Sequence, residues 1–266
     1  IQWDKRNIYP GEYPEVDLWV GIDQLLDLPG LLNGLFKKAR AADGEKGVVE
    51  SEPRFLYDHQ TPRMQLTPAH YAYLKIAEGC DNYCAYCAIP SIRGNRRCRD
   101  PHSVLAEARN LIEKGVKELI VIAQDTAAYA GVDADGETWN LSRLLGELDG
   151  ITGDYWIRVH YMHPAHITDE LIGCFAKTEH LLPYMDIPFQ HAADGVLTAM
   201  NRKVSRAELK VLLTRIREAI PGVALRTTLL VGFPGESEVD FQELVDFVKA
   251  QRFHRLGAFA FYPEEG

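Results

Sequence analysis

The sequence predicts an α/β protein built on a parallel sheet, and three features of the chain support that prediction. From about residue 74 onward, short apolar runs alternate with longer amphipathic segments, and the alternation repeats six times. The short runs are rich in residues that favour strands, and helix-start signals precede several of the long segments. This alternation is typical of a parallel sheet. Six units suit either a doubly wound open sheet or a barrel that stops short of eight units.

The expected strands and helices follow one another along the chain. The expected strands are residues 73–77, 119–123, 155–160, 184–187, 224–231 and 257–261, and the expected helices are residues 101–114, 141–148, 168–176, 195–200, 205–220 and 237–251. Asp100 followed by Pro101 predicts a capped helix start, and Gly115 predicts the end of that helix. Ser205 with Glu208 predicts a capping box. In either architecture, functional side chains gather at the carboxyl ends of the strands.

The first part of the chain has a different pattern. Residues 16–21 resemble a strand and residues 25–41 resemble a helix, which together make one strand–helix unit. Residues 42–67 are polar, contain Gly and Pro, and show no lasting period, so we expect a linker. The expected organisation is therefore a short region at residues 1–67 and a main domain at residues 68–266.

The composition excludes several classes of protein. With 46% hydrophobic residues in 266, the chain can bury an ordinary core, and its apolar runs fall short of the roughly 20 residues that a membrane-spanning helix needs. We expect no membrane contact and a cytoplasmic location, because no secretory signal is visible. A net charge of −9 argues against bulk electrostatic binding of nucleic acid. A local basic cluster could meet an anionic partner or form a solvated or structural face; it consists of Arg93, Arg96, Arg97 and Arg99.

A cluster of cysteines is the strongest signal in the chain. Cys80, Cys84 and Cys87 are separated by three residues and then by two, within a total of five cysteines. An odd total, grouped so tightly in a chain without an export signal, favours metal ligation over disulfides. Three thiolates can hold three irons of a 4Fe-4S cluster and leave the fourth iron open to a ligand.

Other interpretations of these cysteines fit less well. A structural zinc site needs a fourth ligand, and the nearest thiol is Cys98, eleven residues beyond Cys87. A redox pair of Cys84 and Cys87 would leave Cys80 unused. Cys174 lies in an expected helix among apolar residues and is expected in the core, whereas Cys98 has no clear role.

The residues around the cysteines resemble a known family. Tyr86 precedes the last cysteine, and Ala-Ile-Pro-Ser-Ile-Arg-Gly follows it at residues 88–94. Together with the cysteine spacing, these residues resemble the methylthiotransferase branch of the radical S-adenosylmethionine (SAM) enzymes. The Gln-Asp-Thr triplet at residues 124–126, the later Tyr129 and the His-Tyr pair at residues 160–161 resemble the kind that modifies an aspartate of ribosomal protein S-twelve. The resemblance covers residues 71–266.

The resemblance implies a fold, a reaction and partners. The fold would be a partial (β/α)6 TIM-like radical-SAM barrel, preceded by a remnant of an N-terminal α/β domain. The reaction would add a methylthio group to the β-carbon of an aspartate in S-twelve, with a 4Fe-4S cluster, SAM, and a reducing partner such as flavodoxin or ferredoxin. Two alternatives stay open: methylthiolation of a tRNA adenosine, and an iron–sulfur electron carrier, which would normally ligate all four irons.

The remaining candidate site residues lie where the expected strands end. The resemblance and the position of these residues give a set of expected cofactor contacts: Tyr86, Gln124, Asp125, Arg158, Gln190, His191, Leu230, Val231 and Gly232. Arg158 lies within an expected strand, where it could form an internal salt bridge or bind the methionine carboxylate of SAM. His160, His163 and His166 fit no regular spacing, and Pro164 interrupts them, so we expect no histidine metal site.

The chain also departs from the family that it resembles. Such methylthiotransferases carry an N-terminal domain with three further cysteines that hold a second 4Fe-4S cluster, and a small C-terminal β-barrel. Residues 1–70 contain no cysteine. We therefore expect a fragment that can cleave SAM but cannot complete thiolation, and we expect the second cluster in the full-length protein.

Overall fold

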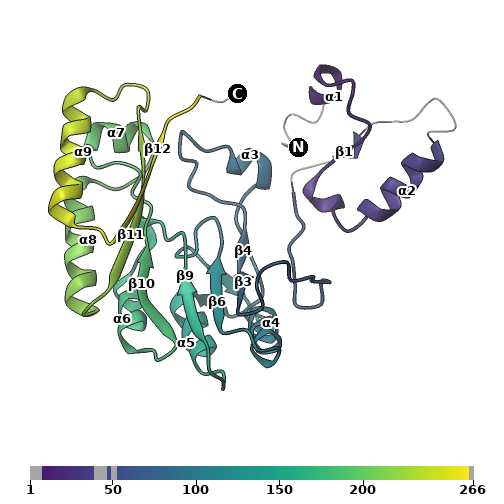
Figure 1. The fold of residues 1–266 in the computed structure, drawn as a ribbon, viewed down its shortest axis with the longest axis horizontal. Coiled ribbons are helices and arrows are strands. Elements are labelled where there is room, and N and C mark those ends of the chain that lie inside the picture. The colour runs from purple at the N-terminus through teal and green to yellow at the C-terminus, as the bar shows by residue number, and fades with distance from the viewer. Residues whose placement is uncertain (1–7, 39–46, 49–52, 264–266) are drawn as a thin grey trace. The chain divides into compact units, whose positions relative to one another are not determined.

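The computed structural model describes residues 8–38, 47–48 and 53–263 (Figure 1). The chain divides into two compact units: the smaller comprises Ile1–Leu56, Gly79–Asp81 and Cys87–Arg97, and the larger comprises Tyr57–Glu78, Asn82–Tyr86 and Cys98–Gly266. Among the described residues, we find no helix with both the length and the apolar character needed to cross a membrane.

A six-stranded parallel sheet forms the centre of the larger unit. Its strands are β3 (Tyr71–Lys75), β6 (Glu118–Ile122), β9 (Trp156–Val159), β10 (Leu181–Asp186), β11 (Ala224–Val231) and β12 (Arg255–Ala260). Each strand pairs in parallel with the next of these along the chain, so the sheet order is β12-β11-β10-β9-β6-β3 (Figure 1). A doubly wound sheet would reverse its order at a switch point. The sequential order therefore confirms a partial TIM-like barrel of the (β/α)6 kind.

Helices follow the strands, as the sequence predicts. They are α4 (Pro101–Glu113), α5 (Leu141–Asp149), α6 (Asp169–Lys177), α7 (Asp194–Ala199), α8 (Arg206–Ala219) and α9 (Glu238–Gln251). The predicted caps are confirmed: the Asp100 carboxylate accepts a hydrogen bond from the Ser103 amide at 2.7 Å, and Ser205 and Glu208 form a capping box. Gly115, with φ of +90°, follows the end of α4.

The two faces of the sheet differ in character. Along β9, Ile157 and Val159 are fully buried and Arg158 between them is partly exposed; along β11, Leu225 and Thr227 are buried and Arg226 is partly exposed. The buried strand residues join buried helix residues in one hydrophobic core. Because side chains alternate along a strand, the opposite face carries the polar side chains.

Some elements differ from the sequence prediction. The first strand begins two residues earlier than expected, because Tyr71 pairs with Glu118 at the start of β6. The antiparallel hairpin of β7 (Ala130–Val132) and β8 (Thr138–Asn140) was not predicted. The Asp133 carboxylate stabilises its turn by accepting hydrogen bonds from the Glu137 amide and the Trp139 indole, both at 2.9 Å. Four other short elements were also missed: β4 (Ala77–Glu78), α3 (Ile89–Arg93), β5 (Arg97–Cys98) and the 3-10 helix η3 (Pro164–His166).

The smaller unit contains little regular structure. Its N-terminal part holds α1 (Tyr9–Glu12), β1 (Trp19–Val20), the 3-10 helix η2 (Ile22–Gln24), α2 (Leu28–Lys38) and β2 (Gly47–Val48). The expected strand at 16–21 is reduced to β1, and α2 falls within the expected helix, whose residues 39–41 lie outside the described residues. β2 pairs in parallel with β1, so the expected linker at 42–67 contains a strand that the sequence analysis missed.

Candidate functional site

The cysteine loop begins with a tight turn after β4. Gly79 has φ of +78°, and a Cβ atom there would lie 2.2 Å from the carbonyl oxygen of Asn95. Glycine is therefore required at this position. The Cys80 amide donates to the Gly94 carbonyl at 3.2 Å, and the Asp81 carboxylate accepts from the Arg96 amide at 2.8 Å. These contacts fix the first cysteine of the loop against the segment that follows the last one.

The middle of the cysteine loop is held by the turn after α7. The Ala85 amide donates to the Met200 carbonyl at 3.1 Å, and the Asn201 side-chain amide donates to the Tyr83 carbonyl at 2.9 Å. Asn201 adopts φ of +56°, a conformation that asparagine tolerates better than most residues. Together these hydrogen bonds set the path of the loop around Cys84.

Arg202 connects this turn to a cysteine sulfur. Arg202 is 4% exposed, and its guanidinium donates to Cys84 Sγ at 3.4 Å, to the Tyr86 hydroxyl at 3.2 Å and to the Pro188 carbonyl at 2.5 Å. A charged donor beside a sulfur can form a charge-assisted hydrogen bond with a thiolate. Sequence reasoning missed Arg202, because only a polar turn after a short helix marks it in the chain.

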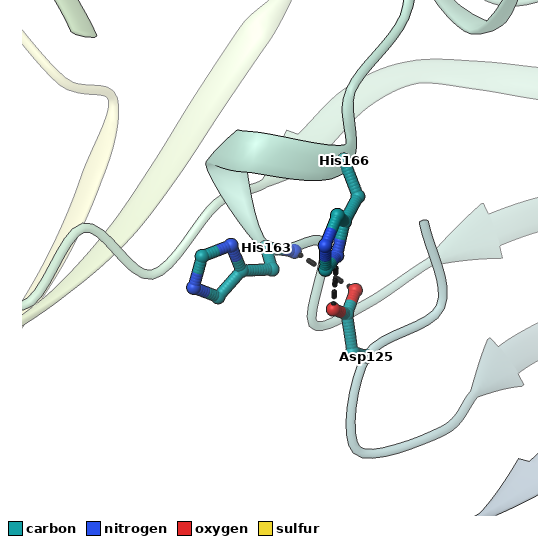
Figure 2. A group of neighbouring side chains, drawn as sticks. All are labelled: Asp125, His163 and His166. Carbon is teal, nitrogen blue, oxygen red and sulfur yellow. Dashed lines mark hydrogen bonds and ion pairs between the residues drawn. The ribbon is translucent and has the colours of Figure 1, made fainter. Parts of the chain in front are cut away.

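Asp125, in the loop after β6, has three hydrogen-bonding partners, and Figure 2 shows two of them, His163 and His166. Its carboxylate is 3% exposed, lies 2.6 Å from His166 Nδ1, and accepts from the Asn82 side-chain amide at 2.8 Å and from the His163 backbone amide at 3.2 Å. Burial alone would raise the pKa of the Asp125 carboxyl, but the hydrogen bonds from His166 and Asn82 outweigh it and hold the pKa below its usual value. Asn82 belongs to the cysteine loop, so Asp125 ties that loop to the sheet.

The histidines near Asp125 are closer together than their spacing suggested. Ligand atoms of Asp125, His163 and His166 lie within 4.8 Å of one another. Figure 2 shows the His163 ring turned away from the carboxylate, with the backbone amide of His163 making the contact. Burial and, next, the nearby Arg202 charge lower the pKa of His163 to about 3, so its ring is neutral. Its Nδ1 accepts from the Ala165 amide, and its buried Nε2 has no hydrogen-bond partner among the described residues.

Gln124, which directly precedes Asp125, is half-buried and has a polar partner. Its side-chain amide donates to Glu78 Oε1 at 3.1 Å, and Glu78, which is 1% exposed, also forms an ion pair with Lys75. The Gln124 side-chain oxygen is buried and has no partner among the described residues. Buried polar atoms are normally hydrogen-bonded. The oxygen is therefore available to a donor group of a ligand.

The structure gives Arg158 an internal partner. Arg158 Nε lies 2.5 Å from Glu118 Oε1, and the guanidinium stacks over the Tyr184 ring at 4.7 Å. Of the two interpretations of Arg158, the salt bridge is found, and contact with a carboxylate of SAM stays a prediction.

A second buried carboxylate, Asp186, is the last residue of β10. His160 Nδ1 lies 2.9 Å from Asp186 Oδ2, and Arg226 donates to Oδ1 at 2.6 Å. Burial opposes ionisation of Asp186, but the hydrogen bonds from His160 and Arg226 keep its pKa below the usual value.

The remaining predicted cofactor contacts lie at the end of β11 and in the segment that follows β10. The backbone of Gln190 bonds to β11: its amide donates to the Thr228 carbonyl, and its carbonyl accepts from the Leu230 amide. His191 is fully buried, and burial lowers its pKa although Glu236 lies 3.6 Å away. Val231 ends the strand, and Gly232 has φ of +76°. Leu230 and Tyr86 pack against one small apolar cluster, so the structure brings these two predicted residues together.

The basic cluster and the other cysteines have structural partners. Arg99 is 2% exposed and pairs with Glu107 at 2.6 Å, so the structural interpretation is correct for this residue. Arg97 donates to the Arg93 and Asn95 carbonyls. Cys98 Sγ accepts from the Ala130 amide at 3.3 Å. None of the five cysteines, all of which the structure describes, forms a disulfide.

Comparison with known proteins agrees with the resemblance seen in the cysteine loop. The family model described as Radical SAM superfamily matches residues 74–248. Ribosomal protein uS12 methylthiotransferase RimO of Pelotomaculum thermopropionicum is 46% identical over 255 residues, and the protein of that name from Opitutus terrae is 42% identical over 267 residues. Each alignment covers 96% of this chain and 56% of the relative. The chain thus spans about half the length of the curated relatives that it matches.

Solved structures share the fold at low sequence identity. The radical S-adenosylmethionine methyltransferase TsrM from Kitasatospora setae, solved with cobalamin and a [4Fe-4S] cluster, superposes with a TM-score of 0.60 at 16% identity, over 71% of this chain and 36% of that one. The cobalamin-dependent S-adenosylmethionine radical enzyme OxsB gives a TM-score of 0.53 at 11% identity, over 66% of this chain and 26% of that one. At such identities the likeness concerns the fold alone.

Proposed function

Because the chain belongs to the radical SAM superfamily, we propose that it is the SAM-cleaving part of a methylthiotransferase, with a 4Fe-4S cluster bound by Cys80, Cys84 and Cys87. The observation that carries this proposal is the cysteine loop itself. Its three thiols are half-buried, lie outside any disulfide, and follow the first strand of the sheet. Thiolates are the ligands with which proteins hold iron–sulfur clusters. The donor set therefore fits the cluster.

The residues around the loop position its ligands. A cluster held by these three thiolates would leave one iron open to SAM and would supply the electron for forming carbon radicals from SAM, which side chains cannot provide. Arg202 holds Cys84 and Tyr86, and Asp125 holds Asn82 of the same loop. The unpartnered oxygen of Gln124 can accept a hydrogen bond from the cofactor. We assign further cofactor contacts to Asp125, Arg158, Gln190, His191, Leu230, Val231 and Gly232.

The proposed reaction of the whole protein is methylthiolation of the β-carbon of an aspartate in ribosomal protein S-twelve. Two relatives named ribosomal protein uS12 methylthiotransferase RimO, 42% and 46% identical to this chain, support this substrate. The Gln-Asp-Thr triplet at residues 124–126 also supports it. We further propose that residues 68–266 are the radical-SAM core and residues 1–67 the end of a preceding domain. The full-length protein would hold a second cluster as the site of the sulfur, take electrons from flavodoxin or ferredoxin, and act in the cytoplasm.

The first experiment tests the cluster and the cofactor. The chain is reconstituted anaerobically, and its iron and sulfide contents and its electron paramagnetic resonance spectrum are measured with and without SAM. We expect about four irons per chain, a signal that SAM changes, and formation of 5′-deoxyadenosine with dithionite. A signal that SAM leaves unchanged, with no 5′-deoxyadenosine, would refute the proposal.

A matched pair of cysteine variants controls this experiment. Cys84→Ala is expected to lose the cluster, whereas Cys174→Ala is expected to keep it. Cys174 lies in α6, where burial raises the pKa of its thiol to about 11 and keeps it protonated. Mass spectrometry of S-twelve and of tRNA after incubation with the full-length protein then tests the substrate. Modified tRNA with unmodified S-twelve would refute the aspartate assignment.

A further inference from the structure

A basic pocket opens on the polar face of the sheet in the larger unit. It has a volume of about 500 Å³, and its lining includes Arg158, His160, Tyr184, Arg226 and Arg255. No acidic residue is among the residues that line it. The chain has a net charge of −9, but this concave surface carries three guanidinium groups and is locally positive.

The sheet places two of these arginines, Arg226 and Arg255, at one level. Arg226 is the register partner of Asp186 on β10 and of Arg255 on β12. Like charges that lie directly opposite each other on adjacent strands destabilise a sheet. The Arg226–Arg255 pair is therefore stabilised if an anion lies between the two side chains.

Among the described residues, two of the three arginines in the pocket have an acidic partner, and the third does not. Arg158 is paired with Glu118, and Arg226 with the buried Asp186. Arg255 is exposed and has no ion pair with any residue that the structure describes. Each guanidinium carries five N–H donors, of which Arg158 and Arg226 use one each in these ion pairs. The pocket thus offers unused donors and one uncompensated positive charge.

We propose that this arginine pocket binds the carboxylate of an acidic side chain in the protein substrate, through Arg226 and Arg255. This inference rests on the proposed function and adds a substrate-binding site to it. A carboxylate carries the single charge that is missing and matches the fork geometry of a guanidinium. The overall charge of −9 opposes a polyanionic nucleic acid. His160, which also lines the pocket, directly follows β9, whereas Arg226 and Arg255 lie near the amino ends of β11 and β12.

The test compares two peptides on the reconstituted chain. One peptide spans the target aspartate of S-twelve, and the other has every Asp and Glu replaced by its amide. We expect the acidic peptide to bind about tenfold more tightly by calorimetry, as one or two charge-assisted hydrogen bonds provide. Arg255→Ala is expected to remove this preference, and Arg255→Lys to retain part of it. The matched control is Arg109→Ala, an exposed arginine on α4 outside the pocket, which should keep the preference.

Five outcomes would overturn the inference, and the first four concern the peptides. Two of them are equal binding of both peptides and no binding of the acidic peptide. A third is an unchanged preference in Arg255→Ala. The fourth is displacement of the acidic peptide by a tRNA stem-loop in the unsubstituted chain but not in Arg255→Ala. A second source of the same chemistry is the methionine carboxylate of SAM. Weaker SAM binding in Arg255→Ala with an intact peptide preference would assign the pocket to SAM and also overturn the inference.

A separate measurement keeps the two proposals distinguishable. Formation of 5′-deoxyadenosine by the unsubstituted chain reports on the radical chemistry without any peptide. A chain that cleaves SAM but binds both peptides equally retains the proposed function and loses the arginine pocket. A chain that prefers the acidic peptide but never cleaves SAM loses the proposed function and retains the pocket.

Discussion

The two faces of the six-stranded sheet carry residues that are neighbours in the chain, but different interactions stabilise them. On β9, Ile157 is fully buried in the hydrophobic core, while Arg158 on the other face pairs with Glu118. On β11, Leu225 is buried and Arg226 pairs with Asp186. Burial of apolar area stabilises one face, and paired charges hold the other. The fold therefore depends mainly on the first face, while the second carries the pocket for which we propose a carboxylate ligand.

The largest expected effect is on the buried face. Ile157→Ala should lower the free energy of unfolding by about 2–5 kcal/mol, because it removes methyl groups from a fully buried site and leaves a cavity. Chemical denaturation followed by circular dichroism measures this loss. Trp156→Ala on the same strand is the control: Trp156 is 57% exposed, so the loss should be within about 0.5 kcal/mol. Equal losses in the two variants would contradict the contrast between the faces.

The second prediction concerns pH and the carboxyl edge of the polar face. The pKa of His163 is about 3 in the folded chain against 6.5 ordinarily, so between these values the unfolded state binds a proton that the folded state does not. Stability should therefore fall as the pH is lowered from 6.5 toward 3, by at most about 1.4 kcal/mol for each pH unit. Asp125, whose pKa is lowered, adds to this loss only in the acidic part of the range.

The variant His163→Asn isolates this contribution. Its side-chain oxygen can still accept from the Ala165 amide, which His163 Nδ1 does at 3.2 Å, but it cannot take up the proton. Urea unfolding at a series of pH values should give a flatter dependence above pH 4 in the variant than in the unsubstituted chain. An identical slope in both proteins would show that the ring of His163 is not the titrating group.

The third prediction concerns Arg202, which links the Pro188 carbonyl, after β10, to Cys84 in the cysteine loop. Arg202→Met should cost about 1.5–3 kcal/mol of stability, because charge-assisted hydrogen bonds to Cys84 and Pro188 are lost. With a reconstituted cluster, the reduction potential should also become more negative, since hydrogen bonds to cluster sulfurs raise it. Arg202→Lys keeps the charge and should shift the potential less. A potential that neither variant changes would leave Arg202 with a packing role only.

Local patterns explain why much of the fold could be predicted. Apolar runs located all six strands of the main sheet within a few residues, and the caps at Asp100 and Ser205 depend on residues three positions away. The hairpin of β7 and β8 was missed although Asp135 and Gly136 form a turn signal, because its strands have only three residues each.

The contacts of the candidate site were less predictable, because they join distant parts of the chain. Arg202 and Cys84 are 118 residues apart, and Asp125 and Asn82 are 43 apart. A spacing rule detects ligands on one loop, such as the cysteines, but it does not detect residues that only the sheet order brings together. The same reason hid the arginine pocket, whose arginines lie on three different strands.

The smallest expected effect tests whether the polar face contributes to stability at all. A double-mutant cycle of Arg158→Met and Glu118→Gln should give a coupling of about 1 kcal/mol or less, because both side chains are partly solvated, at 26% and 20% exposure. Lys117 and Asp154 form the more exposed control pair, at 55% and 92%, and should couple more weakly. A coupling as large as the loss in Ile157→Ala would mean that ion pairs stabilise the fold as strongly as the core does. That result would contradict the conclusion that stability depends mainly on the buried face.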